Sequence, residues 1–330
     1  FAAHIEYTQR FYSVCYPKNP SYSNSPDPER ILRVGYVSSD FRKHAVSRFI
    51  EPVLVHHDRE RIEVHCFYNY IASDGITDRL KNLVEAWHPI AKMQDEDVVS
   101  LVRDLGIDLL IDLSGYTEGH RLPVFAYKPA PVQATWLGYL ATTGLATMDY
   151  RICDAYTDPP GLTESFHTET LARMPDSQWC HLSYQELESI ANLPPGLASI
   201  SELPLLRNSR LTLGSFNSAA KLNNQVLMLW AEVMQAAPSA RLLIAAIPSG
   251  RAQQRIISFL ERSDVDCNRI EFAARLPYDE YLASITQVDI ALDSFPYNGG
   301  ATSIDILMMG VPLVTLRGPK MYEFLDRLVT

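Results

Sequence analysis

Short apolar segments alternate with helix-like segments along most of this chain, and this alternation limits the fold more than any other feature. Apolar runs rich in Val, Ile and Leu that end in small polar residues are typical of strands buried in a parallel sheet. In the first half we predict strands over 31–38, 61–70 and 107–113, and helices from about Ala45, over 78–87 and over 95–105. The short junctions favour a doubly wound α/β sheet over an antiparallel sandwich.

The same alternation restarts in the second half. There we predict strands over 211–216, 241–247, 269–272, 289–293 and 312–316, and helices over 225–236, 251–262 and 302–309. Proline and polar residues are more frequent between Met174 and Arg210, and we therefore place the boundary between the two halves there. The predicted parts are an N-terminal helical segment (1–30), a Rossmann-like domain (31–180), a linker (181–210) and a second Rossmann-like domain (211–330). A cleft between two such halves, at the carboxyl ends of the strands, is where we expect a ligand.

Length and composition agree with a folded protein of two domains. The chain has 330 residues, of which 47% are hydrophobic and 21% charged. Its net charge of −10 argues against a nucleic-acid partner, and we find no basic patch that would reverse this. The apolar runs are too short to cross a bilayer, so no membrane partner is expected either.

The cysteines and the N-terminus indicate a cytoplasmic location. The five cysteines are scattered without CxxC spacing, which argues against a disulfide framework and against a zinc site. The first residues, FAAHIEYTQRFY, form an amphipathic pattern that predicts a helix and lack the basic start and apolar run of a signal peptide.

A glycine-containing loop in the second half is a candidate anion site. The segment 292–310 begins on a predicted strand, passes Gly299 and Gly300, and enters a helix that Thr302 or Ser303 can cap. Backbone amides at a helix start attract phosphate, and glycine lets the backbone approach it closely. Asp305, one turn into the helix, is placed to bind a ribose. A tight strand-to-helix turn with a surface aspartate is the alternative explanation.

Single residues on other strand-exit loops could join this site. Lys221 follows the first strand of the second half, on the same sheet edge, and either pairs with a phosphate or is solvated. His44 stands at a helix start in the first half, where it could accept a proton, donate a hydrogen bond when neutral, or cap the helix. The loops 112–121 and 136–150 are rich in Gly, Ser and Thr, which suits a hydroxyl-rich ligand but is also common in ordinary loops.

Six segments in order resemble the catalytic region of the O-linked N-acetylglucosamine (O-GlcNAc) transferase family, in its bacterial form. They are LRVGYVSSDFRKHAVSRF, GYT (115–117), KPAPVQATWLGY (128–139), TTG with MDYR (142–151), GSFNSAAKLN, and LDSFPYNGGATSIDILMMGVPLVTL. The match in order and spacing runs from about Leu32 to Leu316 and is far more specific than any one motif.

The resemblance implies a GT-B fold, with two Rossmann-like domains facing a central cleft and the second domain shortened. It implies inverting transfer of N-acetylglucosamine from UDP-GlcNAc to Ser or Thr hydroxyls of a protein or peptide, with no metal and no other cofactor. His44 and Lys221 would be the catalytic residues, with Lys221 neutralising the diphosphate. The UDP-sugar site would comprise Leu137, Gly138, Ser218, Leu276, Tyr281, Asn298, Gly299, Gly300, Ala301, Thr302 and Asp305. The acceptor side would comprise Tyr116, Thr117, Thr142 and Thr143.

Several departures from the family pattern leave alternatives open. Leu140 and Ala141 replace a Pro-Gly pair in the sugar loop, and Gly300 and Ala301 replace a His-Thr pair. Upstream helical repeats that recruit acceptors are missing from this sequence, and the segment 320–330 resembles the family's closing helix joined directly to the middle of the domain. The alternatives are a relative that uses UDP-glucose or another acceptor, such as asparagine, and a nucleotide-sugar-binding module without turnover.

Overall fold

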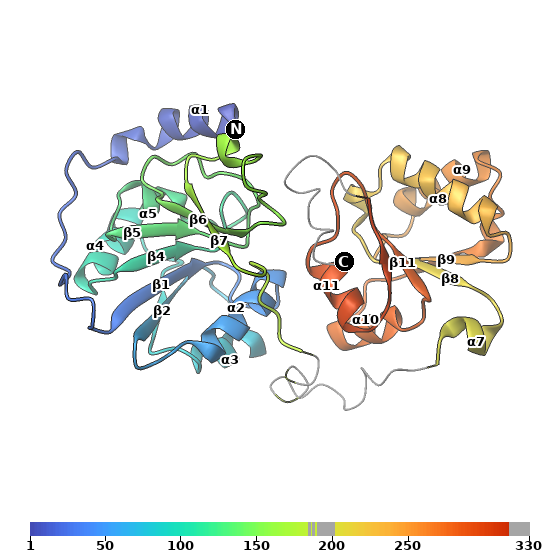
Figure 1. Cartoon of the computed structure of the whole chain (residues 1–330), viewed down its shortest axis with the longest axis horizontal. Coiled ribbons are helices and arrows are strands. Elements are labelled where there is room, and N and C mark those ends of the chain that lie inside the picture. The colour runs from blue at the N-terminus through green and yellow to red at the C-terminus, as the bar shows by residue number, and fades with distance from the viewer. Residues whose placement is uncertain (184–185, 187–188, 190–201, 317–330) are drawn as a thin grey trace. The chain divides into compact units, whose positions relative to one another are not determined.

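A computed structural model describes residues 1–183, 186, 189 and 202–316 (Figure 1). The chain divides into two compact units, Phe1–His181 and Leu182–Thr330. Each unit is built on one sheet in which all neighbouring strands are parallel. The predicted α/β class is therefore confirmed. The expected closing helix over 320–330 lies outside the described residues, as does most of the predicted linker.

The first unit contains a seven-stranded sheet in the order β3-β2-β1-β4-β5-β6-β7. Its strands are β1 Leu32–Ser38, β2 Ile62–Tyr68, β3 Ala86–Pro89, β4 Leu109–Asp112, β5 Val132–Thr135, β6 Tyr150–Asp154 and β7 Thr170–Met174. The strands predicted from 31, 61 and 107 correspond to β1, β2 and β4. The strand order reverses direction between β1 and β4, so the loops that follow these two strands flank a topological switch point.

The helices of the first unit mostly begin where the sequence predicts. They are α1 Ala2–Phe11, α2 Ala45–His56, α3 Gly75–Lys81, α4 Asp95–Asp104 and α5 Leu122–Ala126, with short 3₁₀ turns at Ser13–Cys15 and Glu164–Phe166. The predicted helix over 78–87 is wrong at both ends. A capping box formed by Asp74 and Thr77 starts α3 early, and Trp87 lies in β3, where it pairs with Cys66 of β2.

The N-terminal helix is confirmed and packs on the loops of the first unit. The Thr8 hydroxyl donates to the carbonyl of Gly144 at 2.7 Å, and Thr8 is buried. The His4 ring lies 2.8 Å from the Tyr139 hydroxyl. These contacts explain why α1 belongs to the same compact unit as the sheet.

The second unit contains a five-stranded sheet in the order β10-β9-β8-β11-β12. Its strands are β8 Thr212–Ser215, β9 Arg241–Ala245, β10 Ile270–Ala273, β11 Ile290–Leu292 and β12 Leu313–Val314. Its helices are α7 Pro204–Asn208, α8 Asn224–Ala236, α9 Arg251–Arg262, α10 Tyr278–Ile285 and α11 Ala301–Met308, with 3₁₀ turns at Ala219–Lys221 and Cys267–Arg269. The switch point here lies between β8 and β11.

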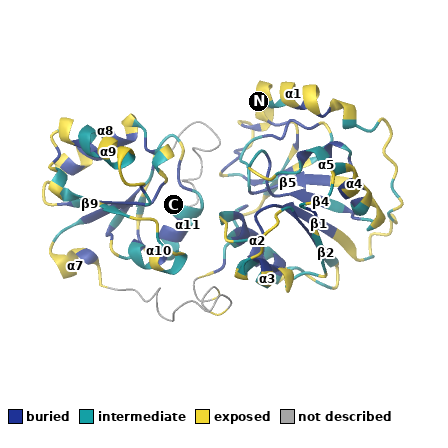
Figure 2. Cartoon of the chain, turned by 180° about the vertical axis from the view of Figure 1, so that it is seen from behind, coloured by how far each residue is buried: buried dark blue, intermediate teal, exposed yellow. Residues whose placement is uncertain are grey.

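Both faces of the second sheet are covered, and this explains why neighbouring residues of its central strand β9 are both apolar. Leu242 packs into a cluster with Trp230 of α8 and Ile256 of α9, whereas the next residue, Leu243, packs into another cluster with Ile306 of α11. Successive residues of a strand point to opposite faces, so each face needs its own apolar set. Figure 2 shows the central strands of both units as buried.

The described residues contain neither a membrane-spanning helix nor a cluster of metal ligands. No helix in the described parts of the chain is long and apolar enough to cross a membrane. Within the same residues, no three His, Cys, Asp or Glu side chains are grouped so that they could hold a metal ion.

Candidate functional site

The predicted site residues lie mainly on loops at the carboxyl ends of the strands. In the first unit His44 follows β1, the segment Ser114–Thr117 follows β4, and Leu137 and Gly138 follow β5. In the second unit Lys221 follows β8, and the segment Asn298–Thr302 follows β11. The loops after β1 and β4, and those after β8 and β11, flank the two switch points, which is where ligands of such sheets bind.

His44 is the N-cap of α2, so the capping interpretation of this residue is confirmed. Its Nδ1 accepts a hydrogen bond from the Val46 amide at 3.3 Å and lies 3.5 Å from a carboxylate oxygen of Asp40. Burial lowers the pKa of His44, and Asp40 only partly opposes this. The lowered pKa favours the neutral form of the ring. Because Nδ1 accepts, the proton of the neutral ring resides on Nε2, which favours a hydrogen-bond donor over a proton acceptor.

The loop after β5 is held against the end of β4. Leu137 has a positive φ of 66°, a conformation that non-glycine residues rarely adopt. A Cβ on Gly138 would collide with the backbone of Leu113, so only glycine fits there. The backbones of Gly138 and Leu113 thus pack closely, which fixes the position of the loop that the family resemblance assigns to the sugar.

The residues predicted for the acceptor side are held by internal hydrogen bonds. Thr142 and Thr143 are each 1% exposed, and both hydroxyls donate to the carboxylate of Glu169, which is itself buried. The Tyr116 hydroxyl donates to the carbonyl of Thr143 at 2.7 Å. The Thr117 hydroxyl turns back to the carbonyl of Ser114 at 2.8 Å. These hydroxyls therefore stabilise the loops through internal hydrogen bonds. Their contact with an acceptor stays a prediction.

Lys221 is a half-buried cation at the end of a short 3₁₀ turn. Its ammonium group donates to the carbonyl of Asn298 at 2.7 Å and lies 4.6 Å from the ring centroid of Tyr297. Burial lowers the pKa of Lys221, and the negative charge of Asp293 opposes that shift. The structure thus joins Lys221 to the glycine-containing loop, as the shared sheet edge predicted.

The start of α11 differs from the prediction in one respect. Gly300 is the N-cap, and no side chain among the described residues caps this helix. Thr302 and Ser303 lie inside the first turn, so neither of them is the cap. A helix start without a side-chain cap keeps its amides for another acceptor, which strengthens the case for an anion site.

Buried oxygen atoms near this helix start lack protein partners. Asn217 Oδ1, Asn298 Oδ1 and Ser303 Oγ have no hydrogen-bond partner among the described residues, although all three side chains are buried. A Cβ on Gly299 would collide with Ser303 Oγ, so the loop packs closely here. Buried polar atoms in a native protein usually find a partner, and a ligand or bound water supplies one at such a site.

The remaining residues predicted to bind the UDP-sugar also lie in the second unit. Asp305 is 1% exposed and accepts a hydrogen bond from the Tyr278 hydroxyl at 3.0 Å. Tyr281 meets Phe216 edge-on, with ring centroids 6.0 Å apart. Leu276 precedes α10 and is partly buried, whereas Ser218 is exposed ahead of the Lys221 turn. No binding role of these residues follows from the contacts alone, so their roles stay predictions.

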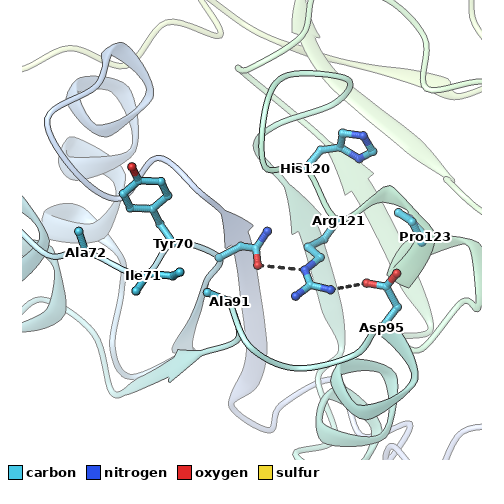
Figure 3. Close-up of a pocket in the computed structure, with 9 residues that line it drawn as sticks. Tyr70, Ile71, Ala72, Ala91, Asp95, His120, Arg121 and Pro123 are labelled. Carbon is cyan, nitrogen blue, oxygen red and sulfur yellow. Dashed lines mark hydrogen bonds and ion pairs between the residues drawn. The ribbon is translucent and has the colours of Figure 1, made fainter.

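A pocket of about 500 Å³ lies on the first unit and contains none of the predicted site residues (Figure 3). Its lining residues are Asn69, Tyr70, Ile71, Ala72, Ala91, Asp95, His120, Arg121 and Pro123. Arg121 is the only Lys or Arg among them, and it already bonds to Asn69, to Asp95 and to two backbone carbonyls. The guanidinium is therefore committed to holding loops together and does not make this pocket a phosphate site.

Comparison with solved structures identifies the class of the fold. A glycosyltransferase from Rickettsia africae matches 86% of this chain and 79% of its own, with a TM-score of 0.54 and 10% identity. At that identity the likeness concerns the fold alone. Two Rossmann-like units, each with one parallel sheet, are the architecture of the GT-B fold.

The chain belongs to glycosyl transferase family 41, which matches residues 11–188 and 202–323. A mutant of the O-GlcNAc transferase of Thermobaculum terrenum matches 98% of this chain and 60% of its own, with a TM-score of 0.88 and 36% identity. The probable UDP-N-acetylglucosamine–peptide N-acetylglucosaminyltransferase SPINDLY of Petunia hybrida is 37% identical over 325 residues, or 96% of this chain. The chain spans only 34% of the length of that relative. The predicted family and GT-B fold are thereby confirmed.

Proposed function

We propose that this chain carries the catalytic region of an inverting glycosyltransferase, which moves N-acetylglucosamine from UDP-GlcNAc to Ser or Thr hydroxyls of proteins. The relative from Petunia hybrida carries the name of that activity, and the T. terrenum protein is an O-GlcNAc transferase. The observation in this chain that carries the proposal is the meeting of Lys221 with the loop that precedes α11. A cation and a helix start without a side-chain cap are together suited to a diphosphate.

In the proposed reaction the acceptor oxygen bonds to the anomeric carbon as the bond from that carbon to the UDP oxygen breaks, and the proton of the acceptor hydroxyl passes to the departing phosphate or to solvent water. UDP leaves with the bonding electrons, so negative charge grows on its phosphate. Lys221 opposes that charge with its ammonium group, and the amides at the start of α11 add partial positive charge. Since Lys221 supplies the positive charge, the proposal includes that no metal ion is needed and that EDTA leaves the rate unchanged.

The His44 ring fits a different task in this mechanism. A neutral imidazole with its proton on Nε2 can donate a hydrogen bond to a substrate oxygen and so orient it.

The cytoplasm is the proposed location of the protein. The cysteines support it, because none of them forms a disulfide: Cys15, Cys66, Cys153, Cys180 and Cys267 are all free.

Transfer to a peptide library tests the proposal. The purified chain is incubated with UDP-GlcNAc or with UDP-glucose, and mass spectrometry records the mass added to each peptide and the residue that carries it. Addition of N-acetylhexosamine to Ser or Thr supports the proposal. Addition of hexose would show that the donor is UDP-glucose instead of UDP-GlcNAc. Addition to another residue type would show that the acceptor is not a Ser or Thr hydroxyl. UDP binding without any transfer would leave only a nucleotide-sugar-binding role.

A further inference from the structure

Asp293, for which the sequence predicts no role, accepts several hydrogen bonds, and its charge acts on Lys221. It directly follows β11, and its backbone amide still pairs with Val314 of β12. One carboxylate oxygen accepts hydrogen bonds from Asn217 Nδ2 at 2.9 Å and from the amides of Ser294 and Gly299, both at 2.8 Å. The other oxygen accepts the Thr315 hydroxyl at 2.9 Å.

These partners come from three different segments of the second unit. Asn217 lies on the loop after β8, Ser294 and Gly299 lie on the loop after β11, and Thr315 follows β12. A single carboxylate therefore ties together the ends of neighbouring strands at the switch point. Hydrogen bonds to an ionised acceptor are stronger than neutral ones, so this side chain can fix the shape of the loop.

Asn298 connects Asp293 to Lys221. Its carbonyl accepts the hydrogen bond from Lys221 Nζ, and its side-chain amide donates to Thr315 Oγ1 at 2.6 Å. Thr315 in turn donates to Asp293. Asn298 is fully buried, so its carbonyl has little freedom to move once these bonds are made. The charge of Asp293 also raises the pKa of Lys221 against the lowering effect of burial.

We propose that Asp293 is a positioning residue, which holds the Gly299 amide and the Asn298 carbonyl so that Lys221 and the start of α11 meet at one diphosphate. This inference rests on the proposed function, because the diphosphate is that of the UDP-sugar donor. Asp293 does not itself touch the donor, since a carboxylate would repel the phosphates. Its effect passes through the loop and through Lys221.

UDP binding to an Asp293→Asn variant, measured by calorimetry on the whole chain, tests the proposal. The substitution keeps the shape of the side chain and removes its charge and one acceptor oxygen. We expect the dissociation constant of UDP to rise by about tenfold or more, because several charge-assisted hydrogen bonds to the loop weaken together.

Asp289→Asn is the matched control. Asp289 stands at the other end of the same strand, β11, and accepts hydrogen bonds from the amides of Leu205 and Thr212. It holds the fold of the unit without contacting the loop or Lys221. We expect this variant to melt at a lower temperature and yet to bind UDP within about twofold of the wild type, once the signal is scaled to folded protein. A merely structural role of Asp293 predicts the same behaviour for both variants.

A double variant shows whether Asp293 acts through Lys221. If it does, Lys221→Met combined with Asp293→Asn weakens UDP binding by less than the product of the two single effects. If Asp293→Asn does not fold, Thr315→Val removes one hydrogen bond from Asp293 and serves in its place. Unchanged UDP affinity in these variants, with a wild type that binds UDP, overturns the positioning role alone. A wild type that does not bind UDP overturns the proposed function, and the positioning role with it.

Discussion

Each unit has an aspartate at an equivalent point of its sheet, and the two aspartates differ in their burial and in the charges near them. Asp112 ends β4 and Asp293 follows β11, the strand beyond the switch point in each unit. Asp112 accepts the amides of Ser114 and Gly115 and the hydroxyl of Thr135 from the neighbouring β5. Asp293 likewise binds two amides of its own loop and the hydroxyl of a threonine that follows the neighbouring β12.

The two aspartates differ in whether a cation interacts with them. Asp112 is fully buried, and no cation is among the causes of its pKa shift: burial raises the pKa of Asp112 to about 6. Asp293 is less buried, and its charge acts on Lys221. The same hydrogen-bond pattern therefore closes a loop in the first unit, whereas in the second it also supports a positive charge. Substitutions at paired positions can separate these two uses.

Removal of the cation should give the largest effect. Lys221→Met is expected to lower the transfer rate by about 10²-fold or more, because charge on the departing phosphate is no longer opposed. Lys128→Met is the control in the first unit, where the ammonium group of Lys128 bonds only to Thr147 and Asp149 among the described residues. It should reduce stability and leave the rate per folded molecule unchanged. Equal rate losses in the two variants would contradict the role of Lys221.

Loss of the buried carboxylate in the first unit should mainly cost stability. Asp112→Ala leaves the amides of Ser114 and Gly115 and the Thr135 hydroxyl without their acceptor. Unpaired buried donors cost about 1–3 kcal/mol each, so we expect the free energy of unfolding of this unit to fall by roughly 3 kcal/mol. Denaturant unfolding followed by tryptophan fluorescence measures this fall. A variant as stable as the wild type would show that these donors find other acceptors.

The pH dependence of stability should distinguish Asp112 in a second way. Its folded pKa of about 6 lies above the ordinary value, so the folded state binds the proton more tightly than the unfolded state does. The contribution of this group to stability is therefore complete below its ordinary pKa near 3.8 and is lost as pH rises through about 6. Asp112→Asn cannot titrate, and its unfolding free energy should change less than that of the wild type between pH 4 and about pH 7. Parallel pH profiles of the two proteins would exclude this coupling.

The paired threonines should give the smallest effects. Thr135→Val and Thr315→Val each remove one hydroxyl that donates to the aspartate of its unit. Each should lower the free energy of unfolding by about 1 kcal/mol. Only Thr315→Val should also weaken UDP binding, by about two- to fivefold, because its loop alone carries the proposed phosphate site. Weaker UDP binding in Thr135→Val would remove the distinction between the two units.

Local sequence patterns determined the class of elements and most of their positions. The alternation of apolar and helix-like segments predicted the α/β class, and the predicted helix over 251–262 coincides with α9. The motifs also identified the family and the loop around Gly299. Such features depend on side-chain spacing within a few residues, which a single segment contains in full.

Only the tertiary structure decided which side chains meet. The sequence assigned Thr142 and Thr143 to the acceptor side, but the fold brings Glu169 to their hydroxyls from beyond the next strand. It also brings Thr315 to Asp293, which no local pattern marked. These partners are 22 to 27 residues apart in the chain and become neighbours because the consecutive strands β5-β6-β7 and β11-β12 lie side by side in their sheets. Hydrogen bonds at strand ends therefore depend on topology, whereas helices and strands depend on local periodicity.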